Sequence, residues 1–216
     1  MLSYLLSSWE NPMNGAESLV KTLVKSGVDV CFTNPGTSEM HFVAALDHVE
    51  GMRCVLGLFE GVVTGMADGY GRMADKPSST LLHLGPGLGN GLANLHNAKK
   101  AHTPIVNIVG DHATYHVEYD APLTADIEGI AKPVSSWVKT SKSSKDIARD
   151  GAEAVMAARS GPGQIATLIL PANTAWDEAN SAANPLDVPP QPKISSETIT
   201  GIAKALCEDG ETLIHM

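Results

Sequence analysis

The sequence is poor in aromatic and basic residues, and each shortage excludes a class of protein. Aromatic residues make up only 5% of the 216 residues, so the base-stacking platforms of single-strand nucleic-acid binders are not expected. Fifteen Lys and Arg against 24 Asp and Glu leave a net charge of −9, which disfavours binding to nucleic acid or to an anionic membrane. No uncharged apolar run approaches the ~18 residues of a membrane span. We therefore expect neither a nucleic-acid partner nor a membrane partner.

Cysteine is also scarce, and Cys31, Cys54 and Cys207 are widely spaced. No Cys-x-x-Cys pair is present, so neither a zinc site nor a disulfide framework is predicted. Cys31 and Cys54 lie in apolar runs, which predicts buried and reduced thiols. Reduced thiols favour a cytoplasmic protein.

Histidine offers one weak candidate for metal binding. His112, His116 and Glu118 have the spacing of metal ligands in a loop, but no further strong ligand follows at a telling distance. We therefore expect no metal site within this chain.

The composition divides the chain into four parts. Residues 1–13 contain no Lys, Arg or A-x-A site, which predicts an N-terminal extension rather than a signal peptide. Residues 14–184 form the main domain, and the proline-rich residues 185–193 indicate a stiff linker. Residues 194–216 predict one helix and a strand that starts at Thr212, which is too little for a domain. We expect them to be the start of an incomplete middle domain.

Short apolar runs alternate with helical patterns through the main domain. A helix is predicted between Asn14, as its N-cap, and Gly27. The expected strands cover residues 28–32, 52–58, 79–84, 104–109, 134–138 and 165–170. The other expected helices cover residues 38–47, 60–73, 90–100 and 146–159. This order predicts an α/β fold with a three-layer open parallel sheet of about six strands and helices on both faces.

The segment Asn34-Pro35-Gly36-Thr37-Ser38 follows the first strand as a turn. In open parallel sheets, ligands bind at the carboxyl ends of strands, so this turn could present backbone groups and a hydroxyl to a ligand. Alternatively, it is a tight turn in which Thr37 or Ser38 caps the next helix.

Glu60 follows an apolar run and opens a helix. It can be a first-turn charge that the helix dipole favours. Alternatively, it is a functional carboxyl whose apolar neighbours, Phe59 and Val62, favour the protonated form of a proton donor. The same helix carries a glycine stripe, defined as Gly61, Gly65 and Gly69. Because each interior glycine costs about 1 kcal/mol of helix propensity, the stripe indicates a close helix contact between subunits, or ordinary close packing on the sheet.

Residues 83–91 predict a glycine-rich turn between a strand and a helix. The dinucleotide fingerprint fails because its third glycine position falls on Leu92 or Asn90, and no GxxxxGK[ST] motif is present. The glycines still permit the close approach of a flat ligand, to which Asn90 could hydrogen-bond. His83 ends the strand toward the same crevice, although a lone histidine there is often structural.

Five segments together resemble one known family over residues 14–180: NPGTSE, LGLFEGVVTGMADGYGR, HLGPGLGNGLANLHNAKKAHTPIVNIVGD, GIAKPVSSWVK and GPGQIATLILPANTAWDE. They resemble the N-terminal pyrimidine-binding domain of thiamine-diphosphate-dependent decarboxylases and carboligases. The local pattern resembles benzoylformate decarboxylases most, and acetolactate synthase large subunits are similar.

The resemblance implies a role for each matched residue. Glu60 matches the glutamate that hydrogen-bonds N1′ of the aminopyrimidine and promotes removal of the thiazolium C2 proton. His83 matches a histidine that transfers protons and contacts the substrate, and Thr37 matches a hydroxyl residue that contacts the substrate carboxylate. Acetolactate synthases generally lack this histidine, so His83 favours a decarboxylase. The remaining matches line the cofactor: Pro35, Gly36 and Asn90.

The resemblance also implies what lies outside this chain. In the family, Mg²⁺ and the diphosphate are held by a C-terminal domain with a GDG…NN signature, which this sequence lacks. We therefore expect a fragment that is inactive alone and that belongs to a homodimer or tetramer acting on a small 2-oxo acid. FAD, which some relatives bind, has no support in these residues. The alternatives are an acetolactate synthase-type carboligase, one subunit of a split enzyme, or a non-catalytic binding module of the same fold.

Overall fold

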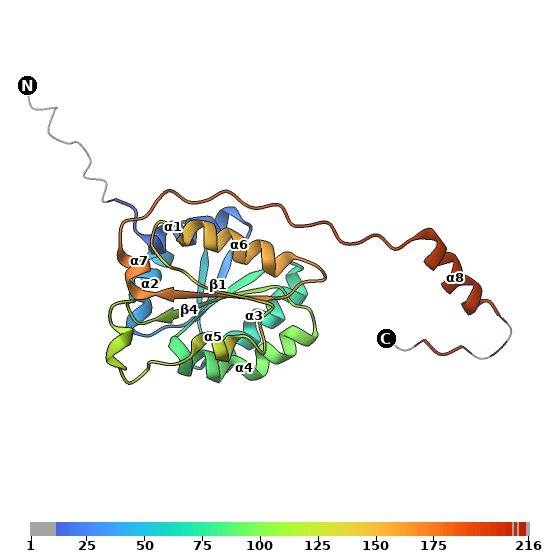
Figure 1. Ribbon diagram of the computed structural model, residues 1–216, viewed down its shortest axis with the longest axis horizontal. Helices are drawn as coiled ribbons and strands as arrows, with labels where there is room; N and C mark the ends of the chain where they lie inside the picture. The colour runs from blue at the N-terminus through green and yellow to red at the C-terminus, as the bar shows by residue number, and fades with distance from the viewer. Residues whose placement is uncertain (1–11, 209, 211, 215–216) are drawn as a thin grey trace, which may run out of the picture.

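The computed structural model describes residues 12–208, 210 and 212–214, and it is organised around a central sheet (Figure 1). Six parallel strands pair in the order β2-β1-β3-β4-β6-β5. Their bounds are Val30–Asn34 for β1, Arg53–Leu56 for β2, Ser78–Leu82 for β3, Ile105–Asp111 for β4, Trp137–Thr140 for β5 and Ile165–Pro171 for β6. The predicted parallel sheet is confirmed.

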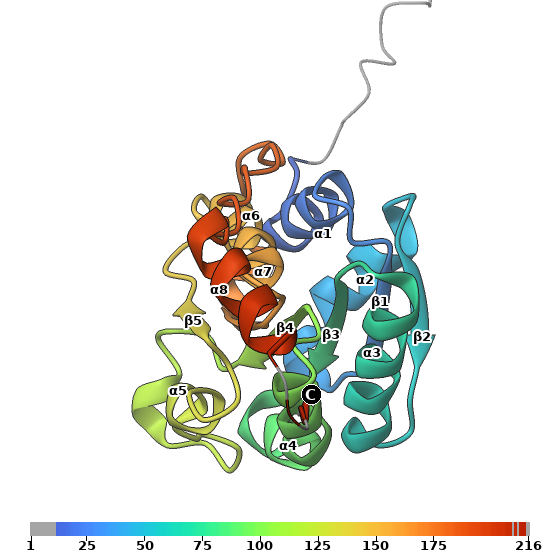
Figure 2. The same ribbon diagram turned by 90° about the vertical axis from the view of Figure 1, so that its right-hand side faces the viewer.

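Helices cover both faces of this sheet, as Figure 2 shows in end view. On one face lie α1 (Gly15–Lys25), α2 (Met40–His48), α6 (Ile147–Arg159) and α7 (Ala172–Trp176). On the other face lie α3 (Glu60–Ala74), α4 (Leu84–Lys100) and α5 (Ile127–Ala131). Two short 3-10 helices, η1 (Thr37–Glu39) and η2 (Val117–Tyr119), lie in loops. The three-layer architecture is therefore confirmed.

The alternation of strand residues separates two cores. Val106 and Ile108 of β4 belong to the core under α1 and α6, whereas Ile105 and Val109 belong to the core under α3 and α4. A parallel sheet that is buried on both faces needs such continuous apolar strands. Asn14 caps α1 as predicted, since its Oδ1 accepts a hydrogen bond of 2.9 Å from an α1 backbone N–H.

A row of buried polar side chains crosses the middle of the sheet. Thr80 of β3 donates to Asn107 of β4 at 2.9 Å, and Asn107 donates to Thr167 of β6 at 3.1 Å. The three residues are direct partners in the strand register, and all are fully buried. Shifting one strand would leave these groups unpaired in the interior, so the row fixes the register of the central strands.

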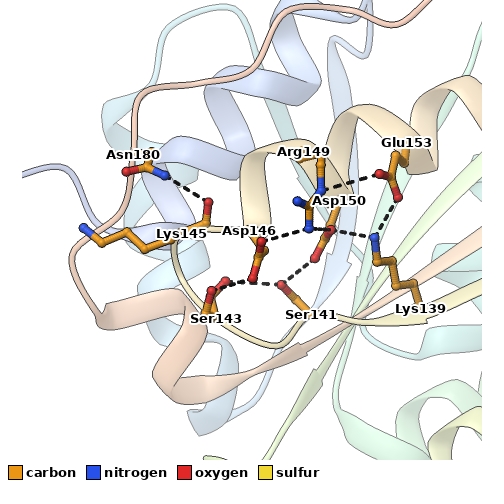
Figure 3. Close-up of polar contacts among 9 residues, drawn as sticks. All are labelled: Lys139, Ser141, Ser143, Lys145, Asp146, Arg149, Asp150, Glu153 and Asn180. Carbon is orange, nitrogen blue, oxygen red and sulfur yellow. Dashed lines mark hydrogen bonds and ion pairs between the residues drawn. The ribbon is translucent and has the colours of Figure 1, made fainter.

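The edge strand β5 is held to α6 by a charged cluster, shown in Figure 3. Lys139 contacts both Asp150 and Glu153 at 2.7 Å, and Ser141 donates to Asp150 at 2.9 Å. Asp150 is 1% exposed. Partial burial lowers the pKa of Lys139, but the two carboxylates outweigh it and hold that pKa above the ordinary lysine value. The cluster thus stabilises the charged lysine against the sheet edge.

Several sequence predictions about local structure are wrong. Helix α4 begins at Leu84, so the glycine-rich segment forms its first turns rather than a separate turn before Asn90. A Cβ on Gly91 would lie only 2.8 Å from Thr64 of α3, so glycine lets the two helices pack closely at this point. This packing outweighs the low helix propensity of glycine. The strand expected over 134–138 lies at Trp137–Thr140, because the short helix α5 and a turn occupy the residues before it.

The prediction that Cys54 is buried is also wrong, although the burial predicted for Cys31 is confirmed. Cys31 is buried, and burial raises the pKa of its thiol to about 12. Cys54 is exposed because β2 is the edge strand and has no neighbour on one side. In the part of the chain that the structure describes, no helix is long and apolar enough to cross a membrane.

The C-terminal part of the chain leaves the sheet after β6 and α7. Residues 179–195 form no helix or strand, and α8 (Ser196–Leu206) has no buried residue and lies apart from the sheet in Figure 1. The strand expected from Thr212 is not formed over 212–214, where it has no partner strand, and His215 lies outside the described residues. Most of the N-terminal extension also lies outside them. The four-part domain division stays a prediction.

Replacing Asp150 by alanine should lower the free energy of unfolding by roughly 1–3 kcal/mol, because Lys139 and Ser141 lose a buried acceptor. Urea unfolding followed by circular dichroism would measure the change. Asp47→Ala on the exposed surface of α2 is the matched control and should change stability by less than about 0.5 kcal/mol. Equal effects of the two substitutions would contradict a structural role for the cluster.

Candidate active site

Four loops meet at the carboxyl edge of the sheet. The Pro35–Glu39 loop follows β1, His83 follows β3, Gly110 lies near the end of β4, and Glu60 begins α3 after β2. Parallel strands bring the ends of all these loops to one edge, where open α/β sheets bind their ligands. Asn34 ties two of the loops together by donating to the carbonyl of Gly57 at 2.8 Å.

Glu60 and Asn90 form the first pair at this edge. The side-chain amide of Asn90, on α4, donates to Oε2 of Glu60 at 3.0 Å. The other carboxyl oxygen, Oε1, faces Gly87, where a Cβ would lie only 3.2 Å away. Glu60 is 8% exposed at the first turn of α3. One carboxyl oxygen is therefore held by Asn90, and the other lies where any side chain larger than glycine at position 87 would crowd it.

Helix α3 is fixed against α4 close to this carboxyl. Thr64 donates to the carbonyls of Glu60 and Gly91, both at 3.0 Å. Asn94 donates to the carbonyl of Gly61 at 2.6 Å. These bonds join the first turn of α3 to the glycine-rich turns of α4, so Glu60 and Asn90 are held in a fixed relation.

His83 forms the second pair, with Glu39. Its Nδ1 lies 2.7 Å from Oε2 of Glu39, and the backbone N–H of Gly36 donates to the same oxygen at 2.7 Å. The histidine ring lies against Gly36 so closely that a Cβ there would overlap it. Gly87 borders both pairs, since its Cβ would lie 3.4 Å from Cβ of His83 as well as close to Glu60. The structure thus brings Glu60, Asn90 and His83 to one place.

Glu39 is the residue that the sequence analysis missed. It is 1% exposed, and burial raises the pKa of its carboxyl even though the hydrogen bonds from Gly36 and His83 act in the opposite direction. The available signal was its position three residues after Gly36, because a glutamate at that spacing can accept a hydrogen bond from the backbone N–H of the N-cap residue, as Glu39 does here.

Thr37 borders a pocket beside these pairs. The structure places Gly36 at the N-cap of η1 and Glu39 at the N-cap of α2, so neither Thr37 nor Ser38 caps the helix. Thr37 is exposed, whereas Pro35 and Gly36 are half-buried. The pocket lies between the loops after β1, β4 and β6 and is lined by Thr37, Ser38, His112, Ala113, Tyr115, His116, Ala172 and Trp176.

His112 and His116 line this pocket. The centroids of their rings lie 5.6 Å apart, and the rings are in a T-shaped arrangement. Within residues 12–208, 210 and 212–214, no group of three or more His, Cys, Asp or Glu side chains is placed to hold a metal ion.

Only part of the glycine stripe on α3 lies in close contact with another helix of this chain. A Cβ on Gly65 would lie 3.0 Å from the side-chain amide of Asn94, so α4 packs closely there. A Cβ on Gly69 would have no neighbour within 4 Å, so the expected contact does not extend to Gly69. A shallow groove between residues of α3 and α4 includes Gly69 and Arg72. A contact between subunits at the stripe stays a prediction.

The chain belongs to the thiamine pyrophosphate enzymes, because the family model of their N-terminal TPP binding domain matches residues 13–131, more than half of the chain. A candidate acetolactate synthase large subunit of Mycobacterium tuberculosis is 59% identical over 187 residues, 82% of this chain and 36% of that protein. The benzoylformate decarboxylase of Pseudomonas aeruginosa is 33% identical over 150 residues, 69% of this chain and 28% of that enzyme.

A solved structure agrees with these sequence relatives. The thiamine diphosphate-dependent 4-hydroxybenzoylformate decarboxylase of Rhodococcus jostii RHA1 matches with a TM-score of 0.80 and 25% identity, over 90% of this chain and 37% of that chain. The family and the N-terminal position expected from the sequence are confirmed. The chain spans about a third of the length of these relatives.

Gly65→Leu should lower the free energy of unfolding by roughly 1–3 kcal/mol, because the new side chain overpacks against Asn94. Gly69→Leu is the matched control, because it faces open space and removes a helix glycine at no packing cost. Chemical unfolding measures stability, and analytical ultracentrifugation measures the oligomeric state. Equal stability of the Gly65→Leu variant and the parent chain would contradict the close contact. If Gly69→Leu alone changes the oligomeric state, the stripe also serves a subunit contact.

Proposed function

We propose that this chain forms the pyrimidine-binding, cofactor-activating part of a thiamine-diphosphate-dependent enzyme that decarboxylates a 2-oxo acid. The observation that carries the proposal is the placement of Glu60. Its carboxyl is nearly buried at the carboxyl edge, with Oε2 held by Asn90 and Oε1 beside Gly87, which has no side chain to crowd it. A flat ring with a basic nitrogen fits this donor set, because a carboxyl can hydrogen-bond that nitrogen and share a proton with it.

Each neighbouring residue then has a distinct task. When bound, thiamine diphosphate supplies a carbon nucleophile and accepts the electrons left behind as CO₂ departs. Glu60 holds a proton at N1′ of its aminopyrimidine, while Pro35, Gly36 and Asn90 line the ring. His83 transfers a proton to or from the reacting substrate, and the hydroxyl of Thr37 binds the substrate carboxylate.

The rest of the active site is proposed to lie on other parts of the assembly. We infer that Mg²⁺ and the diphosphate bind to a separate domain, because the family resemblance implies it. Three apolar residues close to Glu60 in the sequence are exposed: Leu58, Phe59 and Val62 are 90%, 49% and 52% exposed. Exposed apolar residues that lie together often belong to an interface, so they support the proposal that a second subunit of a homodimer or tetramer covers this region. The cytoplasmic location expected from reduced thiols stays a prediction.

A carboligase of the acetolactate synthase type is the second candidate. The 59% identical relative from Mycobacterium tuberculosis favours it by name. His83 favours the decarboxylase, because the paired imidazole at this turn is suited to proton transfer. Product analysis with one 2-oxo acid, with and without a carbonyl acceptor, separates an aldehyde product from a ligated one.

Glu60→Gln, made in a complete enzyme that carries this domain, tests the proposal. The amide keeps the shape of the side chain but cannot hold the proton at N1′, so deuterium exchange at C2 of the bound cofactor should fall by roughly 10²–10⁴-fold. Cofactor affinity, measured by calorimetry, should change far less. Glu50→Gln, at an exposed residue after α2, is the control. Normal exchange in a folded, cofactor-bound Glu60→Gln enzyme would show that Glu60 is only a first-turn helix charge.

His83→Ala in the same enzyme should slow turnover of the 2-oxo acid by roughly 10²–10⁴-fold and leave C2 exchange unchanged. Thr37→Val should mainly raise KM, because the substrate carboxylate loses a hydroxyl partner. His96→Ala, on the exposed side of α4, is the control for His83. Unchanged rates of the His83→Ala enzyme with every productive 2-oxo acid would remove His83 from the mechanism.

A further inference from the structure

Glu39 is a buried acid with an incomplete set of hydrogen-bond partners. Its Oε2 accepts two hydrogen bonds, from the N–H of Gly36 and from His83, each at 2.7 Å. Its Oε1 is buried and has no partner in the described part of the chain. Leaving a carboxyl oxygen unpaired in the interior is costly, and such groups call for an explanation beyond packing.

Two glycines make room for Glu39 and His83. A Cβ on Gly110, at the end of β4, would overlap Oε1 of Glu39. A Cβ on Gly36 would overlap the ring of His83. Gly110 lies within strand β4, so no turn requires a glycine there. Close approach of the carboxyl is the requirement that this position meets.

The pairing also determines which nitrogen of His83 remains available. Nδ1 is engaged by the buried carboxylate oxygen, while the histidine side chain keeps 24% of its surface exposed. Nε2 makes no hydrogen bond to the residues that the structure describes. A carboxylate that accepts the N–H at Nδ1 leaves the neutral ring with an unprotonated Nε2, the nitrogen that can accept a proton.

We propose that Glu39 is a positioning residue, which fixes the Nδ1-protonated form of His83 and directs Nε2 toward the substrate. The catalytic role of this positioning rests on the proposed function, whereas the hydrogen bond between Glu39 and His83 is independent of it. In this arrangement Glu39 never touches substrate or cofactor. It orients the imidazole through the bond to Nδ1, and this bond links the loop after β1 to the loop after β3.

Nitrogen NMR of this chain, labelled with ¹⁵N-histidine, tests the pairing directly. At a pH where His83 is neutral, the long-range ¹H–¹⁵N pattern should show a protonated Nδ1 and an unprotonated Nε2. In Glu39→Ala the ring should revert toward the Nε2-protonated form. Glu39→Gln should restore the Nδ1-protonated form, because its amide oxygen can accept both hydrogen bonds. Glu50→Ala, at an exposed site, should leave the His83 signals unchanged. The wild-type chain alone can overturn the proposal, by showing Nε2-protonated His83.

A second arm tests the consequence for catalysis in a complete enzyme that carries this domain. Glu39→Ala should slow turnover by roughly 10²-fold, and adding it to His83→Ala should cause no further loss. Additive losses would mean that Glu39 acts independently of His83 and would overturn the proposal. Failure of the cofactor exchange test at Glu60 would instead remove the proposed function and leave the NMR result standing.

Discussion

The site depends on the in-register parallel pairing of β1, β3 and β4. Parallel pairing places the loops after these strands at one edge, although their residues are far apart in the sequence. The buried row from Thr80 through Asn107 to Thr167 resists any slip of the central strands. Because His83 follows β3 directly and Glu39 follows β1 by one short loop, a slip would separate the two. The polar row joins β3 to β4, so within this geometry it fixes the strand that precedes His83 against the strand that carries Gly110.

Glycine supplies the second constraint, which is space. Gly36, Gly87 and Gly110 each lie where a Cβ would meet His83, Glu60 or Glu39. These glycines lie around two buried carboxyls, those of Glu60 and Glu39, whose environments differ. Glu60 is 8% exposed and is held on one oxygen by a neutral amide, whereas Glu39 is 1% exposed and packs against a histidine and a strand. The first arrangement suits a group that meets a ligand, and the second suits a group that holds another side chain.

Much of the fold and part of the site followed from the sequence. Alternating apolar runs and helical patterns predicted the sheet, and the ends of its strands led to Glu60 and His83. Periodicity did not find the start of α4, because contacts such as Gly91 against Thr64 override the low propensity of glycine. Glu39 was missed because its partner lies 44 residues away, and no local pattern reports such a contact. Edge exposure of Cys54 was missed because an apolar run does not reveal the order of the strands.

The proposed role of Glu60 is to hydrogen-bond the aminopyrimidine of thiamine diphosphate. A crystal structure of a complete enzyme that carries this domain, with the cofactor bound, is the decisive measurement. We expect a carboxyl oxygen of Glu60 within about 2.6–3.2 Å of N1′, with Asn90 beside the ring. An aminopyrimidine bound elsewhere, with Glu60 hydrogen-bonded only to protein groups, would refute this role.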